Sequence, residues 1–412
     1  MQVARGLNLW GALICVPLIY GCSSAPGGSP GAGGSAAAGT GGGMAGTGGM
    51  AGTGGGMAGT GGSVSPPPQT CVPPANRDMP PEKLSQTGCV NPADPKTLAA
   101  SVVPYEVNSP LWSDGADKQR GLALPTGGKI HVKNCTATPA ECPGARDVAD
   151  DGKWVMPVGT VMVKSFLFDG KFVETRLFVR YDATTWAGFT YKWDEAQTDA
   201  TLVWTERDEV MFKTGQRTVH WYYPARRDCV KCHVPEANDT LGTETQQMNR
   251  VVNGMNQIDR LAAMGAFEVA PPKPYRAALV APVASAAGNP PASATVEQRV
   301  TSYLHANCGF CHRPKDDVDC TSEPCFDARF GLPFGSRMMC NVRPSKNDFG
   351  IVDAAILSPG SPAKSIMSFR MHQPPDDDVE KHGRMPPLAS YVVDQPAVDL
   401  INSWITSITS CP

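Results

Sequence analysis

Residues 160–181 read TVMVKSFLFDGKFVETRLFVRY, which is two runs of β-branched and aromatic residues joined by Asp169-Gly170. Such runs are typical of strands, and an Asp-Gly pair between them predicts a tight hairpin. In the second run, alternation separates Phe172, Glu174, Arg176, Phe178 and Arg180 from Val173, Thr175, Leu177, Val179 and Tyr181. We expect the second, less polar set to face a core.

Similar short runs flank this hairpin, at residues 129–133, 186–193, 201–205, 210–213 and 218–223. Many short strands separated by turn residues predict an antiparallel β-sandwich, which we assign to residues 71–223. Beyond residue 224 the apolar spacing becomes helical, at 259–267, at 295–305 and in a C-terminal helix that has Asp394 as a possible N-cap and Pro396 in its first turn. The fold class expected is therefore multi-domain α+β, with an all-α second part.

The pentapeptide CxxCH occurs twice, as residues 229–233 (CVKCH) and 308–312 (CGFCH). This spacing predicts covalent c-type haem attachment. Each thiol of a pair can form a thioether to the porphyrin edge, and the following histidine can ligate the iron. We therefore expect two haems, bound through Cys229, Cys232 and His233 and through Cys308, Cys311 and His312.

Paired CxxC elements also occur in zinc sites, disulfides and redox-active dithiols. A zinc ribbon usually has its two CxxC knuckles about 15–20 residues apart, whereas a long Pro-rich stretch separates these two. The histidine directly after both pairs favours haem. Two haems in turn predict electron transfer.

The N-terminus predicts export. Arg5 precedes a short apolar run at residues 7–20, which indicates a signal peptide over residues 1–21. The run ends in residues 19–23 (IYGCS), which resemble a bacterial lipobox, so Cys22 is expected to carry lipid and to anchor the protein to a membrane of the cell envelope. Residues 22–70 are rich in Gly, Ala and Ser, with repeats beginning at Met44, Met50 and Met57, and this composition predicts a disordered tether.

The 14 cysteines include eight that are assigned neither to the signal peptide, nor to lipid, nor to haem. An even remainder in an oxidising compartment predicts disulfides. Short loops favour Cys71–Cys89, Cys135–Cys142 and Cys320–Cys325, which leaves Cys340 for Cys411. The formal charge of −3 says little about partners, and no basic patch with interleaved aromatics indicates nucleic acid.

The arrangement after residue 293 resembles a small c-type cytochrome, in which a helix runs into CxxCH and the last helix packs across it. The resemblance implies a cytochrome c-like domain over residues 293–412, after a first haem-binding segment at 224–292. It also implies a distal ligand on the intervening loop, where Met385 in the sequence GRMPP is the candidate and Met371 the runner-up. For the first haem, Met248 is the weak choice among Met248, Met255, Met264, His220 and His305.

Residues 103–411 as a whole resemble a family of bacterial two-haem c-type cytochromes, many of them predicted lipoproteins. The matching stretches are residues 103–114, 157–164, 174–177, 197–200, 224–229 and 307–312. The resemblance implies haem binding and electron transfer at the cell envelope, with an unknown redox partner protein. The tether and the insert between Cys135 and Cys142 fall outside it.

Three function classes follow from these expectations. A tethered electron carrier would have both irons six-coordinate, whereas a redox enzyme such as a two-haem peroxidase would keep one coordination position open. A carbohydrate-binding or adhesion module that carries haem is the third class. Asp114 and Asp199 in loops also invite a calcium or sugar site, although loop carboxylates usually cap turns.

Overall fold

The computed structural model describes residues 69–144, 146–204, 208–215, 217–285, 288–313, 326–373, 383–387 and 390–412. The expected signal peptide, the lipid site at Cys22, nearly all of the tether and the expected Cys320–Cys325 pair lie outside the described residues. Residues 64–412 form one compact unit. Among the described helices, none combines the length and the apolar character that a membrane crossing requires.

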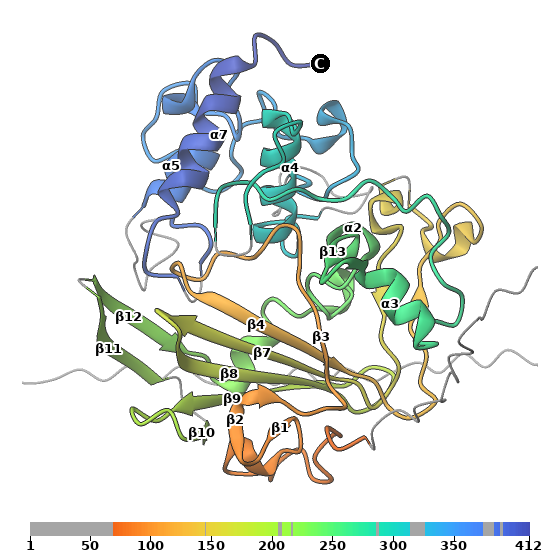
Figure 1. Ribbon diagram of the computed structural model, residues 1–412. Helices are drawn as coiled ribbons and strands as arrows, with labels where there is room; N and C mark the ends of the chain where they lie inside the picture. The colour runs from red at the N-terminus through yellow and green to blue at the C-terminus, as the bar shows by residue number, and fades with distance from the viewer. Residues whose placement is uncertain are drawn as a thin grey trace, which may run out of the picture. The chain divides into compact units, whose positions relative to one another are not determined.

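A single antiparallel sheet of six strands, in the order β10-β9-β8-β7-β4-β3, forms the centre of this unit (Figure 1). Its strands are β3 (Val103–Pro104), β4 (Asp117–Ala123), β7 (Val161–Phe168), β8 (Lys171–Arg180), β9 (Trp186–Trp193) and β10 (Ala200–Val203). The predicted hairpin joins β7 to β8 and pairs Phe168 with Lys171. Asp169 and Gly170 have positive φ values of 49° and 76°, as a two-residue turn between twisted strands requires.

Both faces of this sheet are buried. Leu177 and Val179 of the predicted core set pack in one cluster with Cys71, Leu84 and other residues that precede β4. Phe178, from the set expected outside, is also buried, and it packs in a second cluster on the opposite face. The expectation of a β-sandwich is therefore wrong: the second face is covered by loops and helices from later in the chain, not by another large sheet.

The other strands form two-stranded ribbons. They pair β1 (Val90–Asn91) with β2 (Asp94–Leu98), β5 (His131–Val132) with β6 (Trp154–Val155), β11 (Asp208–Thr214) with β12 (Arg217–Tyr223), and β13 (Val251–Val252) with β14 (Met255–Asn256). All seven predicted runs contain an observed strand. The polar strand β4, which reads DKQRGLA, carried no local strand signal.

The helices are short. They are α1 (Arg226–Cys229), α2 (Thr245–Met248), α3 (Gln257–Ala263), α4 (Val296–Asn307), α5 (Ile366–His372) and α7 (Gln395–Ser407). The 3-10 helices are η1 (Leu84–Gln86), η2 (Pro139–Glu141), η3 (Asp147–Asp150), η4 (Pro235–Ala237), η5 (Phe334–Arg337) and η6 (Pro362–Lys364).

The expectation of all-α cytochrome c-type haem domains is wrong. Strands predominate in the described fold, and between α4 and α5 the described chain runs through loops that contain Pro333, Pro344, Pro359 and Pro362. A proline lacks the N–H that a helix interior needs, so these residues keep the segment from becoming helical. Helices α4, α5 and α7 nevertheless share one apolar cluster that includes Leu304, Met371 and Trp404.

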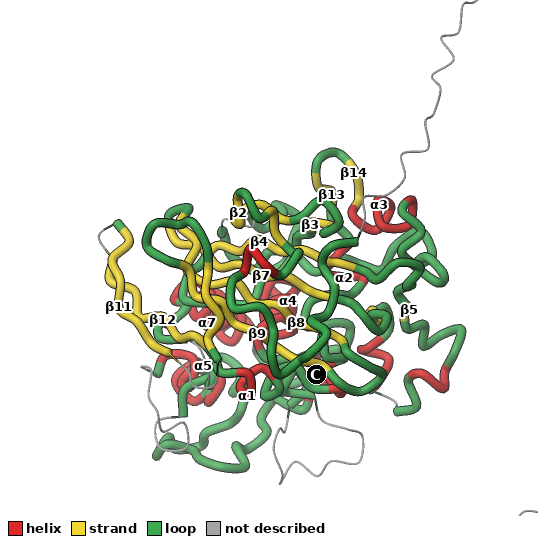
Figure 2. Tube along the Cα trace, turned by 90° about the horizontal axis from the view of Figure 1, so that it is seen from below, coloured by secondary structure: helices red, strands yellow, loops and turns green. Residues whose placement is uncertain are grey.

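Helix α4 lies over one face of the sheet. Figure 1 shows it on one side of β7 and β8, and in Figure 2, seen from below, it overlaps the same strands. Hydrogen bonds join the loop before β4 to this helix: Ser109 Oγ donates to Ser302 O at 2.9 Å, and Trp112 N donates to Asn307 Oδ1 at 2.7 Å. The loop that leads into β4 thus ties the sheet to α4.

Three of the predicted disulfides are confirmed: Cys71–Cys89, Cys135–Cys142 and Cys340–Cys411. The first closes the segment that covers one sheet face, and the last joins the C-terminal end of the chain to the loop before α5. The described cysteines outside these bridges are the four of the CxxCH motifs.

Candidate functional site

The first CxxCH motif packs on the face of the sheet that looks toward α4. Helix α1 ends at Cys229, whose sulfur lies against Gly188 of β9 so closely that a Cβ at residue 188 would meet it at 2.3 Å. The His233 ring packs on Phe178 of β8, with 4.1 Å between ring centroids. The motif therefore packs on a glycine and an aromatic ring from two neighbouring strands.

The environment of His233 suits a metal ligand. Its Nδ1 lies 2.5 Å from the backbone oxygen of Asp239, which can accept the ring N–H. Burial lowers the pKa of His233 to about 4, so the imidazole is neutral at physiological pH. A neutral histidine that donates through Nδ1 to a carbonyl keeps Nε2 for a metal, which is the usual arrangement around ligating histidines.

The second motif follows directly from α4, because the helix ends at Asn307 and Cys308 is the next residue. The His312 ring stacks on Phe326 at 4.2 Å. Its buried Nδ1 has no hydrogen-bond partner among the described residues, and burial lowers its pKa to about 4. Both motif histidines thus present neutral rings against an aromatic neighbour.

The motif thiols do not have the properties of a redox-active dithiol. Burial raises the pKa of Cys232 to about 11 and that of Cys308 to about 12. Reactive CxxC cysteines have lowered pKa values. Within the described residues, His, Cys, Asp and Glu form no group of three or more that could hold a metal ion, so a zinc knuckle receives no support either.

Residues of both motifs line one cavity of about 520 Å³ between the sheet and α4, although Cys308 and His312 are not among them. Cys229, Cys232 and His233 line it from the sheet side, and Gly309, Phe310 and Cys311 line it from the end of α4. Much of the wall is apolar, with side chains such as Val107, Met162 and Phe178. Sequence reasoning gave no means of predicting that the two motifs, far apart in the chain, would share this space.

The predicted distal ligands lie in different places. Met385 is half-buried, and its N–H donates to Arg370 O at 3.1 Å; the charge of Arg370 also contributes to the lowered pKa of His312. Pro386 and Pro387, which follow Met385, line the cavity. Met371, the runner-up, is buried in the cluster of the C-terminal helices. Arg370 thus interacts with both Met385 and His312, and the ligand role of Met385 is still a prediction.

Met248, the weak choice for the first haem, is fully buried in the apolar cluster around Trp154 and does not line the cavity. Met255 and Met264 are exposed. His220 stacks on Tyr391 at 3.7 Å and is also absent from the cavity wall. Of these candidate ligands for the first haem, His305 lines the cavity.

His305 forms a buried pair with Glu244 in the cavity wall. Its Nε2 lies 2.6 Å from Glu244 Oε1, while its Nδ1 accepts the Phe330 N–H at 2.8 Å. Because Nδ1 accepts, the ring proton is on Nε2 and points at the carboxylate. Burial alone would raise the pKa of Glu244, but the hydrogen bond from His305 and the charge of Lys153 lower it. The sequence showed no local signal for this pair, since 61 residues separate its members.

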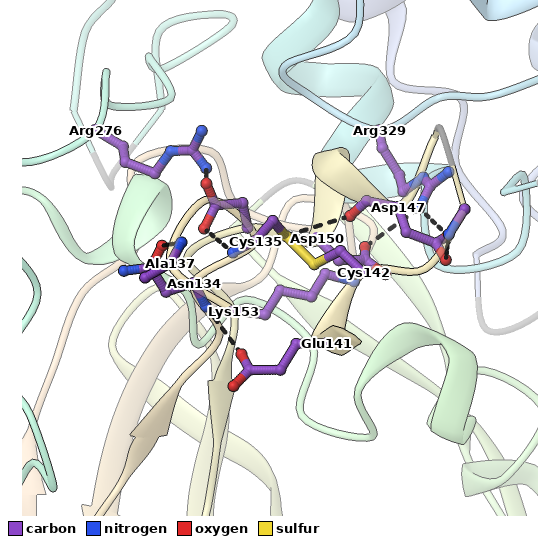
Figure 3. Close-up of a disulfide and its surroundings, with 12 residues drawn as sticks. Asn134, Cys135, Ala137, Glu141, Cys142, Asp147, Asp150, Lys153, Arg276 and Arg329 are labelled. Carbon is purple, nitrogen blue, oxygen red and sulfur yellow. Dashed lines mark hydrogen bonds and ion pairs between the residues drawn. A yellow bond between two sulfur atoms is a disulfide. The ribbon is translucent and has the colours of Figure 1, made fainter. Parts of the chain in front are cut away.

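The Cys135–Cys142 disulfide lies beside an ion-pair cluster that includes Asp150, Lys153 and Arg329 (Figure 3). The Cys135–Cys142 bridge closes a loop that precedes η3, and Asp150 at the end of η3 lies 2.9 Å from Lys153 Nζ and 2.9 Å from Arg313 Nη2. Arg329 Nη1 lies 3.4 Å from the same carboxylate. Since Arg313 follows His312 in the chain, this ion-pair cluster holds the end of the motif.

The loop carboxylates noted in the sequence bind backbone. Asp114 accepts hydrogen bonds from Tyr391 N and Val392 N, both at 2.9 Å. Asp194 accepts from Thr198, and Asp199 accepts from Ser85, within or next to the turn after β9. These contacts cap and join loops, and they leave no cluster suited to calcium among the described residues.

Comparison with protein-family models found no matching family. Comparisons with curated proteins and with solved structures found no significant match. The resemblance to two-haem cytochromes is therefore still a prediction based on the motifs and stretches quoted above.

Proposed function

We propose that this chain is a di-haem electron carrier of the bacterial cell envelope, with one c-type haem attached at each CxxCH motif. The observation that carries the proposal is the shared cavity: Cys229, Cys232 and His233 of the first motif and residues 309–311 of the second line one largely apolar space, and all four motif thiols are outside the disulfides. Ligand cavities in proteins are typically about 300–1,000 Å³ and mainly apolar. In this proposal the carrier does not have the all-helical cytochrome fold.

The residues present suit covalent haem. The described cysteines outside the motifs are all in disulfides, so the four motif thiols are the ones left for thioether bonds. Bound haem supplies one-electron chemistry. His233 and His312 would each hold an iron from one side, and Met385 would be the second ligand at His312 and raise that site's reduction potential relative to two nitrogen ligands.

The envelope location rests on the N-terminal sequence. In this proposal Cys22 is acylated, and the tether lets the folded part reach a redox partner protein while the lipid stays in the membrane. Placing both haems at one cavity would let an electron pass between them inside the protein before it leaves for the partner.

The proposal is tested by haem stoichiometry. The protein is expressed with a c-type maturation system, washed in acidic acetone and assayed as the pyridine haemochrome, with two covalent haems per chain expected. Cys229→Ser with Cys232→Ser, or Cys308→Ser with Cys311→Ser, should leave one haem, because each pair holds its own. The disulfide variant Cys71→Ser with Cys89→Ser, on the opposite face of the sheet, is the control and should keep two. Polypeptide that loses all colour in the wash contradicts the proposal.

A redox enzyme is the second candidate, and the buried pair of Glu244 and His305 in the cavity wall favours it. An ionised carboxylate held by a neutral histidine can take up a proton beside an open coordination position, which is general acid–base chemistry. Cyanide separates the two functions. An enzyme with an open iron binds it, and Glu244→Gln should weaken that binding by about tenfold, because the carboxylate that could take up the proton of HCN is removed.

The exposed variant Glu236→Gln is the matched control for this measurement and should leave cyanide binding unchanged. A carrier with two closed irons shows no absorption change when cyanide is added, and this result rejects the second candidate.

A further inference from the structure

Three cationic side chains form a row across the sheet on the face that lines the cavity. Arg120 of β4 lies directly opposite Lys164 of β7, and Lys164 lies directly opposite Arg176 of β8. All three line the cavity. Like charges directly opposite on neighbouring strands destabilise a sheet, so we expect anions near a row of three cations, where they offset the repulsion.

The protein supplies anions at the two ends of the row. Glu106 Oε2 lies 3.4 Å from Arg120 Nη1. Arg176 donates to both oxygens of Glu174, at 2.5 and 2.9 Å. Each arginine of the row thus has one carboxylate partner: Glu106 for Arg120, and Glu174 for Arg176.

The middle of the row is different. In the described part of the chain, no carboxylate oxygen lies within ion-pair distance of Lys164 Nζ, which instead lies 5.0 Å from the centre of the Phe166 ring. Burial lowers the pKa of Lys164 well below its usual range, and the charges of Arg120, Lys118 and Arg176 lower it further. A cation that faces a cavity under these conditions is stabilised by an anion in that cavity.

The row lies beside the first CxxCH motif. Two residues along the same strands, Met162 pairs with Phe178, and Phe178 pairs with Gly188. Phe178 packs against the His233 ring, and Gly188 packs against the Cys229 sulfur. Residues two apart on a strand are about 7 Å apart on the same face, so an anion at the row is within reach of a group attached at this motif.

We propose that Arg120, Lys164 and Arg176 form a carboxylate-binding site in the wall of the cavity. The identity of the ligand rests on the proposed function: with haem attached at Cys229 and Cys232, the carboxylates are the propionates of that haem. The site itself does not depend on haem, because a small free carboxylate has the same chemistry. Arginine and lysine are the residues that recognise such groups.

The first experiment measures the two reduction potentials of the holoprotein by spectroelectrochemistry. Lys164→Met removes a positive charge next to one haem and should lower one potential, because a nearby cation favours the reduced form. The other potential should not change. Lys171→Met, at the exposed end of β8, is the matched control and should leave both potentials unchanged. Lys164→Arg should restore the wild-type value, since it keeps the charge.

The second experiment adds succinate to the same holoprotein and records the thermal midpoint. If propionates fill the site, succinate has no saturable effect and the potential shift is seen. If a free carboxylate fills it, succinate raises the midpoint saturably in the wild type, and Lys164→Met abolishes this rise. Either result supports a carboxylate site. The response to succinate shows whether the carboxylate comes from a haem propionate or from a free ligand.

One combined result overturns the proposal: Lys164→Met changes neither a potential nor the response to succinate, and only raises the thermal midpoint by relieving repulsion in the row. Arg120→Gln gives the same test from the end of the row if Lys164→Met does not fold. A protein with no covalent haem fails the haemochrome assay, which contradicts the proposed function, while the succinate experiment still tests the site.

Discussion

Replacing Asp114 by Ala is expected to destabilise the protein by about 3–5 kcal/mol, because it removes a buried charged acceptor from several donors at once. Asp114 is 1% exposed. Its carboxylate accepts from Tyr391 N and Val392 N at 2.9 Å and lies 3.2 Å from Ser390 Oγ. Without it, these donors are buried and unsatisfied. The measurement is the free energy of unfolding in urea.

The matched control is Asp117→Ala, at the exposed start of β4, which should change the unfolding free energy by no more than about 0.5 kcal/mol. Equal stability of the two variants would show that the loop is held by other contacts. Arg384 is the residue to examine in that case, because its guanidinium donates to Ser390 Oγ at 2.9 Å and to Val392 O at 3.0 Å.

The Asp114 contacts also have a functional consequence. They hold residues 390–392, a few positions after Met385, to the loop before β4. The same loop binds the end of α4 through Trp112 and Asn307, next to Cys308. If Met385 is an iron ligand, we therefore expect Asp114→Ala to weaken its bond to the iron at the second motif. The absorption spectrum of that haem should change, while the spectrum of the haem at the first motif should not.

Replacing Asp150 by Asn is expected to cost a similar amount, about 3–5 kcal/mol, because it removes the carboxylate that pairs with the buried Lys153 and Arg313. Burial alone would raise the pKa of Asp150, but Lys153, Arg313 and Arg329 together hold it well below its usual range. Asparagine keeps the shape of the side chain and removes its charge, so the difference in unfolding free energy reports the electrostatic part.

The pH dependence gives this prediction a second readout. A carboxyl whose folded-state pKa is depressed contributes its full stability above the unfolded-state pKa of about 4, and loses it as the pH falls toward the folded value. The wild type should therefore lose stability below about pH 4 more steeply than Asp150→Asn. Asp147→Asn, in the same turn but 37% exposed, is the control and should follow the wild-type curve closely. Parallel curves for wild type and Asp150→Asn would contradict the assignment.

Much of the fold was predictable where the signal is local. Alternating apolar residues and an Asp-Gly turn placed β7 and β8, apolar spacing over residues 295–305 placed α4, and Asp394 marked the start of α7 as its N-cap. Short spacing indicated the Cys71–Cys89 and Cys135–Cys142 bridges. In each case the residues that decide the structure are neighbours in the chain, so propensity and spacing contain the information.

The errors arose where partners are distant. Strand β4 is polar and Gly-containing, and it exists because β7 pairs with it over seven residues. The all-α expectation for the C-terminal part followed from helical patterns that are real in α4 and α7, but the chain between them contains prolines, and its residues 391–392 are held by Asp114, which is distant in sequence. Propensity is a weak prior that such tertiary contacts override.

The sequence by itself determined the chemistry available to this protein, since two CxxCH motifs specify the thiols and imidazoles whatever surrounds them. Only the tertiary structure decided that both motifs face one cavity, that His305 meets Glu244 in its wall, and that Arg120, Lys164 and Arg176 stand in a row beside the first motif. The physical reason is that burial and charge compensation act between residues that are close in space, and strand register and loop packing set those distances over many tens of residues.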